Sequence, residues 1–348
     1  MTTTHEQQGV GPLADVTIDV RGLRRRYAVP QRLGASRARG SGRPRPETFE
    51  AVKGLDLQVR RGELFALLGT NGAGKTSALE LVEGLALPSG GTVRVLGHDP
   101  YAERATVRPQ IGIMLQEAGF PGGLTVREMA TTWQRTLSGP RPIGETLEMV
   151  ALDHRSTVAI DSLSGGERRR LDLALTLMGR PSVVFLDEPT TGLDPQSRHH
   201  TWELIRGLLE EQTTVLLTTH YLEEAEALAD RIAIMHEGRI AREGTLSDIV
   251  SRQPTRISFR LLDDPSAGEQ LDMLRRVGGA GFHTEQRAGG HAVSLETFDA
   301  QPLLTQLLGW AHGRTQLAEL RVLPGSLEQA FLDVARQDHT PTSLEEAA

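Results

Sequence analysis

The sequence predicts an α/β fold in which helices cover a mostly parallel sheet. Over about residues 16–245, short apolar runs of strand length alternate with stretches of helical periodicity, as in parallel strands joined by helices. One of these runs, residues 63–68, leads into a glycine-rich loop that opens a helix. The pattern restarts at residue 254, which indicates a small α+β domain over residues 254–337.

The composition limits the classes of function. The formal charge of −7 gives no general reason to expect nucleic-acid binding, so no specific nucleic-acid partner is expected. The absence of cysteine excludes disulfides and cysteine-based zinc sites. No apolar run approaches the roughly 20 residues that span a bilayer, and the first residues lack the features of a signal peptide. A soluble, cytoplasmic protein is expected, and a role in transport would require another chain to cross the membrane.

The N-terminal part is predicted to be a disordered lead over residues 1–15, followed by a strand. Residues 16–20 alternate like an edge strand. The stretch 21–46 has nine arginines and no acidic residue, and it contains several glycines, serines and prolines. This composition favours a mobile loop, with a basic insert at residues 28–46. The basic stretch can be interpreted as a solvated loop, as an anionic-lipid contact or as a nucleic-acid contact.

The glycine-rich loop fits the phosphate-binding pattern G-x-x-x-x-G-K-[ST]. Its residues are Gly69, Thr70, Asn71, Gly72, Ala73, Gly74, Lys75 and Thr76. Glycines let the backbone turn tightly and present its N–H groups to an anion, and the helix that begins there adds its positive end. Lys75 is expected to reach the outer phosphates of a nucleotide, and the Thr76 hydroxyl to bind Mg²⁺. Ser77, the next residue, is also expected at the nucleotide.

The other elements continue the alternation of strands and helices. Strands are expected at 55–59, 92–95, 111–115, 183–186, 214–218 and 232–234, the last of which closes this part of the chain. Helices are expected at 77–82, 125–137, 143–152, 166–178, 195–211 and 222–229. Residues 117–180 are therefore predicted to form a helical insert.

Polar residues follow several of the buried strands. Asp187 and Glu188 come directly after strand 183–186, whose end is expected beside that of strand 63–68, at the edge where parallel sheets bind ligands. Asp187 would hold Mg²⁺, and Glu188 would accept a proton from an attacking water or orient that water. Gln116 and His220 also end apolar strands at this edge. Gln116 could join the metal or the water, and His220 could contact a γ-phosphate or steer the water.

A second anion-binding pattern precedes an arginine-rich helix. Ser164 supplies a hydroxyl, and Gly165 and Gly166 expose backbone N–H groups where the helix starts. One nucleotide site rarely needs two such loops from one chain. The pattern therefore predicts a second molecule, with each phosphate loop facing the Ser-Gly-Gly of the other subunit.

This combination of motifs resembles the ATP-binding cassette (ABC) family, in the same order and with rough agreement in spacing over about residues 16–245. The matches are Walker A at 69–76, the Q-loop at Gln116, the signature sequence at 163–167, Walker B with its catalytic glutamate at 185–188, the D-loop at 192–194 including Asp194, and the switch histidine at His220. The signature sequence is highly specific to this family.

The resemblance implies a fold and a mechanism. Residues 16–250 would form a P-loop NTPase-type ABC ATPase domain, with a mostly parallel core sheet, an antiparallel β subdomain and a helical subdomain at about 117–180. Two ATP molecules, with Mg²⁺, would lie in a head-to-tail homodimer, where Walker A and B of one subunit meet Ser164, Gly165 and Gly166 of the other. Hydrolysis at Glu188 would reopen the dimer, and the helical subdomain would transmit its closure to a separate membrane permease.

The adenine-stacking aromatic residue departs from the family pattern. The family places it shortly before the second strand, but here Tyr27 precedes most of the basic stretch and Phe49 follows it. The position of Tyr27 after the first strand favours it over Phe49, and both candidates remain open.

Residues 218–226 and 238–244 look like the drug-exporter branch, whose best-known members serve daunorubicin-type antibiotic resistance. Exporters of lipids or polysaccharides look similar. The expected function is the ATPase subunit of an exporter, peripheral on the inner face of the cell membrane. The alternatives are a soluble ATP-switched protein of the translation or repair type, and the ATPase of an importer.

The C-terminal domain is predicted to combine strands at 256–261, 292–295 and 320–323 with helices at 270–277 and 302–310. A last helix would begin after Ser326, with Gln329 completing a capping box, and residues 338–348 would form a tail. Without a catalytic constellation, this domain is interpreted as a packing or dimer-supporting unit, or as a regulatory or substrate-sensing one.

Overall fold

The computed structural model describes residues 15–28, 48–116, 119–262, 267–287 and 289–336, and it divides into two units at Thr245 and Leu246. The division falls before the predicted boundary at residue 250, because helix α8 (Leu246–Val250) packs with α11 (Leu327–Arg336) of the second unit. Residues 1–14 of the predicted lead, residues 29–46 of the predicted insert and the whole predicted tail lie outside the described residues.

The first unit is built on a six-stranded sheet with the order β5-β6-β7-β3-β8-β9. Its strands are β3 (Leu64–Gly69), β5 (Ile111–Met114), β6 (Val183–Asp187), β7 (Thr214–Thr219), β8 (Arg231–His236) and β9 (Arg239–Gly244). The first five strands in that order are parallel, and β9 is an antiparallel edge strand. The parallel α/β core is thus confirmed, whereas β6 was wrongly expected beside β3, because β7 lies between them.

Strand β9 was missed by the sequence analysis. It follows β8 through a tight turn at Glu237 and Gly238, which both have positive φ angles, of 44° and 82°. Hairpin turns of this kind match the twist of paired strands. The strand itself reads Arg-Ile-Ala-Arg-Glu-Gly and has no buried alternation, so it carries no strong strand pattern.

An antiparallel sheet with the order β2-β1-β4 packs against the core. It consists of β1 (Val16–Ala28), β2 (Thr48–Arg60) and β4 (Gly90–Val95). Two expectations were wrong here, since β1 is the central strand and it continues through residues 21–28, which were read as a loop. Two arginines of this segment have an acidic partner on the neighbouring strand β2, where Glu50 forms ion pairs with Arg24 at 3.1 Å and Arg26 at 3.4 Å.

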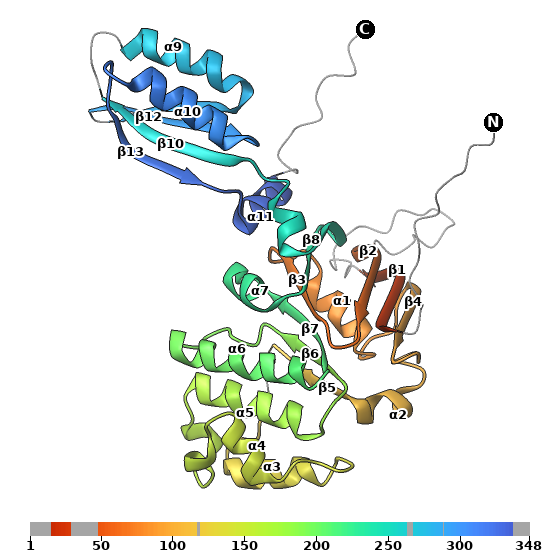
Figure 1. Cartoon of the computed structure of the whole chain (residues 1–348). Helices are drawn as coiled ribbons and strands as arrows, with labels where there is room; N and C mark the ends of the chain where they lie inside the picture. Colours follow the sequence, from red (N-terminus) through yellow and green to blue (C-terminus); the bar gives the residue numbers. More distant parts are fainter. Residues whose placement is uncertain (1–14, 29–47, 117–118, 263–266, 288, 337–348) are drawn as a thin grey trace, which may run out of the picture. The chain divides into compact units, whose positions relative to one another are not determined.

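Three helices of the predicted insert share one apolar core: α3 (Val126–Gln134), α4 (Ile143–Met149) and α5 (Gly165–Met178). Figure 1 shows them gathered at one end of this unit, beyond α6 (Pro195–Glu210). The remaining helices are α1 (Lys75–Val82), the short α2 (Arg104–Val107) and α7 (Leu222–Leu228). The insert thus places α5, which begins at the Ser-Gly-Gly motif, beside the core sheet.

The second unit is a βαββαβ domain with an antiparallel sheet of order β11-β12-β10-β13. Its strands are β10 (Thr255–Leu262), β11 (Phe282–Arg287), β12 (Gly290–Thr297) and β13 (Leu317–Leu323). Helices α9 (Ala267–Gly278) and α10 (Ala300–Ala311) cover one face of the sheet (Figure 1). Strand β11 was not predicted, since most of its residues are polar and exposed.

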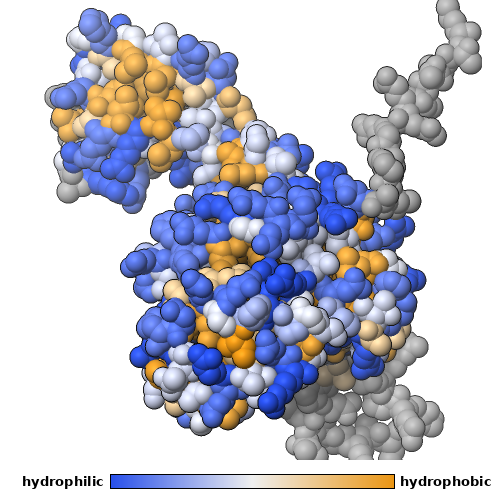
Figure 2. All heavy atoms as spheres, turned by 60° about the horizontal axis from the view of Figure 1, so that its bottom comes forward, coloured by the Kyte–Doolittle hydropathy of each residue, from blue (hydrophilic) through white to orange (hydrophobic). Residues whose placement is uncertain are grey.

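The predicted capping box opens α11. Gln329 N–H donates to Ser326 Oγ at 3.2 Å, and Ser326 N–H donates to Gln329 Oε1 at the same distance. None of the described helices is long and apolar enough to cross a membrane. Figure 2 shows a surface that is mostly hydrophilic, with smaller apolar patches on both units.

Glu83 directly follows α1 and is only 1% exposed. Burial, together with Asp187 and Glu80, raises its pKa to about 8. In the nucleotide-free protein, the free energy of unfolding should therefore fall between pH 4.5 and about 8, because unfolded chains release this proton while folded chains retain it. We expect Glu83→Gln to remove this contribution and to stabilise the protein at pH 8 by on the order of a few kcal/mol, with little effect at pH 4.5.

Urea unfolding of the wild type and of Glu83→Gln at several pH values measures this effect. The difference between the two proteins isolates Glu83 from the other titrating groups. A difference that does not change between pH 4.5 and 8 would show that the buried carboxyl does not resist ionisation.

Candidate active site

The predicted phosphate loop lies between β3 and α1, as the motif requires. Gly74 has a φ of +100°, and a Cβ there would lie 2.3 Å from the Ala51 carbonyl oxygen, so only glycine fits. Gly238 N–H donates to the Ala73 carbonyl at 2.9 Å and so ties the loop to the turn after β8. The loop is thus positioned by its close approach to Ala51 and by its hydrogen bond with Gly238.

Lys75 lies inside the loop. Its Nζ donates to the carbonyl oxygens of Gly69 at 2.7 Å and Thr70 at 3.3 Å, and the residue is 6% exposed. Burial lowers the pKa of Lys75, and the nearby carboxylates of Glu188 and Asp187 oppose this shift. The structure therefore places a buried cation at the point where the phosphate loop closes.

Asp187 ends β6 and is 4% exposed. It is paired in register with Thr218 of β7, and the Thr218 hydroxyl donates to Asp187 Oδ1. Burial raises the pKa of Asp187, and Lys75 and Arg169 oppose that effect. Sequence reasoning missed Thr218, which could have been found from the parallel register of the two strands.

Glu188 is held in place from two sides. The His220 Nδ1 lies 3.0 Å from Glu188 Oε1, and the Thr191 hydroxyl donates to Oε2 at 3.2 Å. Glu188 is 8% exposed and has a φ of +50°, which is unusual for a residue other than glycine. The structure thus brings together the predicted Glu188 and His220, and it adds Thr191, which the sequence analysis did not identify.

Gln116 follows β5 and has an exposed side chain. The structure connects it to the carboxylates through its backbone, because the Arg169 guanidinium donates to the carbonyls of Gln116, Asp187 and Glu188. Arg169 lies on α5 and was not predicted as a site residue.

The Ser-Gly-Gly motif and Asp194 form helix starts. Ser164 caps α5, accepting from Glu167 N–H at 3.2 Å, and both Ser164 and Gly165 are exposed. Asp194 caps α6, accepting from the backbone N–H groups of Gln196 and Ser197, each at 3.0 Å. Among the hydrogen bonds and ion pairs of the described residues, none joins these two starts to the phosphate loop of the same chain.

Both candidate adenine-stacking residues lie on paired strands. Tyr27 of β1 is the direct cross-strand partner of Phe49 of β2, and the two are 37% and 57% exposed. The Tyr27 hydroxyl lies 3.0 Å from Ser77 Oγ at the start of α1, and the Arg25 guanidinium is 4.8 Å from the Tyr27 ring centroid. Tyr27 therefore has the direct contact with the helix that follows the phosphate loop.

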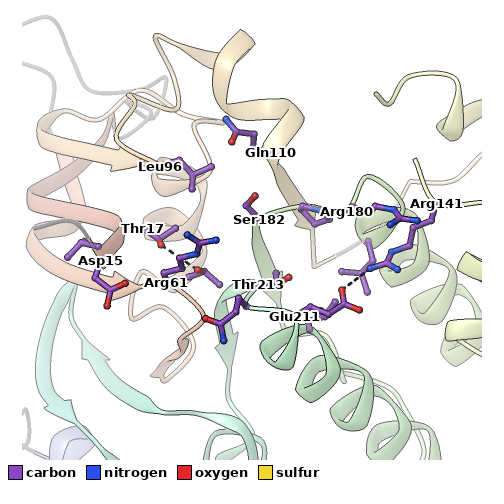
Figure 3. Close-up of a pocket in the computed structure, with 16 residues that line it drawn as sticks. Asp15, Thr17, Arg61, Leu96, Gln110, Arg141, Arg180, Ser182, Glu211 and Thr213 are labelled. Carbon is purple, nitrogen blue, oxygen red and sulfur yellow. Dashed lines mark hydrogen bonds and ion pairs between the residues drawn. The ribbon is translucent and has the colours of Figure 1, made fainter. Parts of the chain in front are cut away.

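A cavity of about 620 Å³ lies away from these motifs (Figure 3). It is lined by Arg61, Ser182 and Thr213, which precede β3, β6 and β7. Its walls thus come from the amino ends of the parallel strands, whereas the motifs follow the carboxyl ends, where ligands bind in such sheets. The cavity and the motifs therefore lie at opposite ends of the parallel strands.

The donor set fits a magnesium ion. Thr76, Gln116 and Asp187 all offer oxygen atoms, the ligands that Mg²⁺ prefers. A protein-bound Mg²⁺ usually takes one or two carboxylates and completes its coordination shell with water and phosphate. No group of three or more acidic or histidine side chains that could hold a metal ion occurs among the described residues.

The phosphate loop, the buried carboxylates and the helix-covered parallel sheet define a nucleotide-hydrolysing α/β protein. A family model described as ABC transporter matches residues 52–191. The daunorubicin/doxorubicin resistance ATP-binding protein DrrA of Streptomyces peucetius is 36% identical over 307 residues, which are 86% of this chain and 92% of that protein. The Nod factor export ATP-binding protein I of Paraburkholderia xenovorans (strain LB400) is 37% identical over 295 residues, 81% of this chain and 90% of that protein.

Solved structures agree on the fold. The ATP-binding subunit of an ABC transporter matches with a TM-score of 0.57 and 25% identity, covering 67% of this chain and 91% of that one. The cassette MJ0796, a dimer in a post-hydrolysis state with ADP and phosphate, matches with a TM-score of 0.56 and 22% identity, covering 66% and 98%.

The chain belongs to the ABC transporter family. It is the ATP-binding and ATP-hydrolysing subunit of an ABC exporter, and its relatives do not favour the alternatives of a soluble ATP switch or an importer ATPase.

Proposed function

We propose that the cluster at the carboxyl ends of β3, β6 and β7 binds ATP and hydrolyses it. The backbone of residues 69–77 and the Lys75 ammonium bind the phosphates. On binding, the ammonium gives up its hydrogen bonds to the loop carbonyls and donates to phosphate oxygens instead. Thr76 and Asp187, together with Gln116 shortly after β5, would hold Mg²⁺, which would neutralise charge at the phosphates.

Glu188 acts as the general base for the attacking water. A base must lie within hydrogen-bond reach of that water and keep its orientation. The contacts of Glu188 with His220 and Thr191 supply the orientation, and this arrangement is the single observation that carries the proposal. His220 remains 39% exposed and is available to contact a γ-phosphate as well.

Two copies of the chain pair head to tail, with ATP between them. Ser164 caps α5, which begins with Gly165 and Gly166, and among the described residues no hydrogen bond or ion pair joins this motif to the phosphate loop of its own chain. Asp194, which follows the two carboxylates in sequence, caps α6. Exposed backbone N–H groups at a helix start suit the phosphates of a nucleotide held by another subunit. The second unit supports packing or dimerisation.

The dimer drives a separate multi-helix membrane permease and lies as a peripheral subunit on the inner face of the cell membrane. Two relatives are named for daunorubicin/doxorubicin resistance and for Nod factor export. The molecule exported with this chain is accordingly proposed to belong to a drug-like, lipid or polysaccharide class. Contact with anionic lipid is proposed for the part of the basic stretch beyond β1, because Arg24 and Arg26 within β1 are already paired with Glu50.

A pull-down with tagged Glu188→Gln protein and ATP, from detergent-solubilised membranes of the native host, tests this function. Recovery of a multi-helix membrane protein is expected. Recovery of the closed homodimer alone, or of ribosomes or DNA, would overturn the permease assignment. The same experiment without ATP is the control for nonspecific capture.

Tyr27 is proposed to stack on adenine. We expect Tyr27→Ala to raise the Kd for ATP by about 10-fold, since stacking on an aromatic side chain contributes roughly 1–3 kcal/mol per base. Equilibrium binding of a fluorescent ATP analogue measures the change. Phe49→Ala is the matched control, because Phe49 is the cross-strand neighbour on the same sheet. A larger loss for Phe49→Ala than for Tyr27→Ala would transfer the role to Phe49.

A further inference from the structure

Three consecutive arginines at the start of α5 bind different parts of the fold. Arg168 donates to the carbonyls of Ile160 and Asp161, and Arg170 donates to two carbonyls at the end of α4. Both of these arginines therefore stay within the helical region. Only the middle one, Arg169, reaches the ends of the core strands.

The Arg169 guanidinium is almost completely used by backbone carbonyls. Nη1 donates to the carbonyls of Leu115 at 2.7 Å and Gln116 at 3.0 Å, the two residues that follow β5. Nη2 donates to Asp187 and, at 2.7 Å, to Glu188, and Nε donates to Pro189 at 3.2 Å. The acceptors are thus Leu115, Gln116, Asp187, Glu188 and Pro189. The side chain is 10% exposed, and Asp172, one turn further along α5, lies 3.6 Å away.

The three consecutive acceptors, which begin at the last residue of β6, require an unusual backbone. Carbonyls of neighbouring residues in an extended strand point in opposite directions, so they cannot meet one cation. Here Glu188 has a φ of +50°, and its carbonyl turns toward the same guanidinium as its neighbours. The guanidinium of arginine presents its N–H donors in a fixed, planar arrangement that suits such a set of acceptors, and a lysine ammonium does not reproduce this arrangement.

We infer that Arg169 is a positioning residue that fixes Glu188 and the backbone of Gln116 relative to α5. The inference rests on the proposed role of Glu188 as the base. Arg169 acts on the main chain of both strand ends, and it does not touch the nucleotide. Because Ser164 caps α5, the same arginine also links the Ser-Gly-Gly motif to the backbone of Glu188.

The test compares ATP hydrolysis by Arg169→Gln, Arg169→Lys and Arg170→Gln. The last is the matched control, because Arg170 is the neighbouring arginine of α5 and donates to two carbonyls that lie outside the strand ends. We expect kcat of both Arg169 variants to fall at least about 10-fold with the Kd for ATP within about threefold, as for a misplaced catalytic group. Arg170→Gln should keep kcat within about threefold. Binding of one ATP per chain verifies that each variant is folded.

A double-mutant cycle separates positioning from general damage. In a Glu188→Gln background, Arg169→Gln should lower the residual single-turnover rate by less than about twofold, because the group it positions is gone. Multiplicative losses, a normal kcat for Arg169→Gln, equal losses for Arg169→Gln and Arg170→Gln, or Arg169 variants that fail to bind one ATP per chain would each overturn the inference. Normal turnover by Glu188→Gln itself would instead overturn the role of the base.

Discussion

The Glu188→Gln variant is expected to bind ATP and to hydrolyse it at least about 100-fold more slowly than the wild type, the range that general-base catalysis contributes. An amide has nearly the shape of the carboxylate, so the contacts with His220 and Thr191 can be kept in modified form. It cannot accept a proton from water. The loss should therefore fall on kcat, while the contacts of Lys75 and the phosphate loop still hold the nucleotide.

Steady-state phosphate release and equilibrium ATP binding measure the two parts of this prediction. Glu223→Gln is a suitable control, because the Glu223 side chain is 80% exposed and its ion pair with Arg198 is long, at 3.8 Å. It should hydrolyse ATP at the wild-type rate. Near-normal turnover by Glu188→Gln would remove Glu188 from the role of base, and loss of ATP binding would show that the substitution disturbs the site more broadly.

The parts of the site that the sequence predicted are those that depend on local chain order. The phosphate loop requires a strand, glycines and a helix in succession, and each is readable from neighbouring residues. Glu188 and His220 were identified because each ends a buried strand, and the structure brings them to 3.0 Å.

What the sequence did not predict depends on partners that are distant in the chain. Residues 21–28 looked like a basic loop because their acidic partner, Glu50, lies on another strand. Arg169 looked like one member of an arginine run, and its role depends on five carbonyls from two strand ends. Strand β9 owes its place to pairing with β8 and not to its own polar sequence.

Lys75→Ala is expected to weaken ATP binding by at least about 100-fold, or about 2.7 kcal/mol, in the range of charge-assisted hydrogen bonds to a buried ion. Lys75 is 6% exposed, so its charge is little screened by water, and alanine leaves the outer phosphates without a cation inside the loop. The substitution also leaves the carbonyls of Gly69 and Thr70 without their donor. Hydrolysis should be lost as a consequence of the lost binding.

The chain offers a matched control for this prediction, because Lys53 is its only other lysine. The Lys53 side chain is 33% exposed and lies 4.0 Å from Glu237 at the surface, so Lys53→Ala should leave the affinity for ATP within about twofold. Isothermal titration with ATP and Mg²⁺ compares the two variants, and thermal unfolding checks that Lys75→Ala is folded. A folded Lys75→Ala protein with undiminished affinity would mean that backbone N–H groups alone hold the phosphates, and the nucleotide would then have to lie differently in the loop.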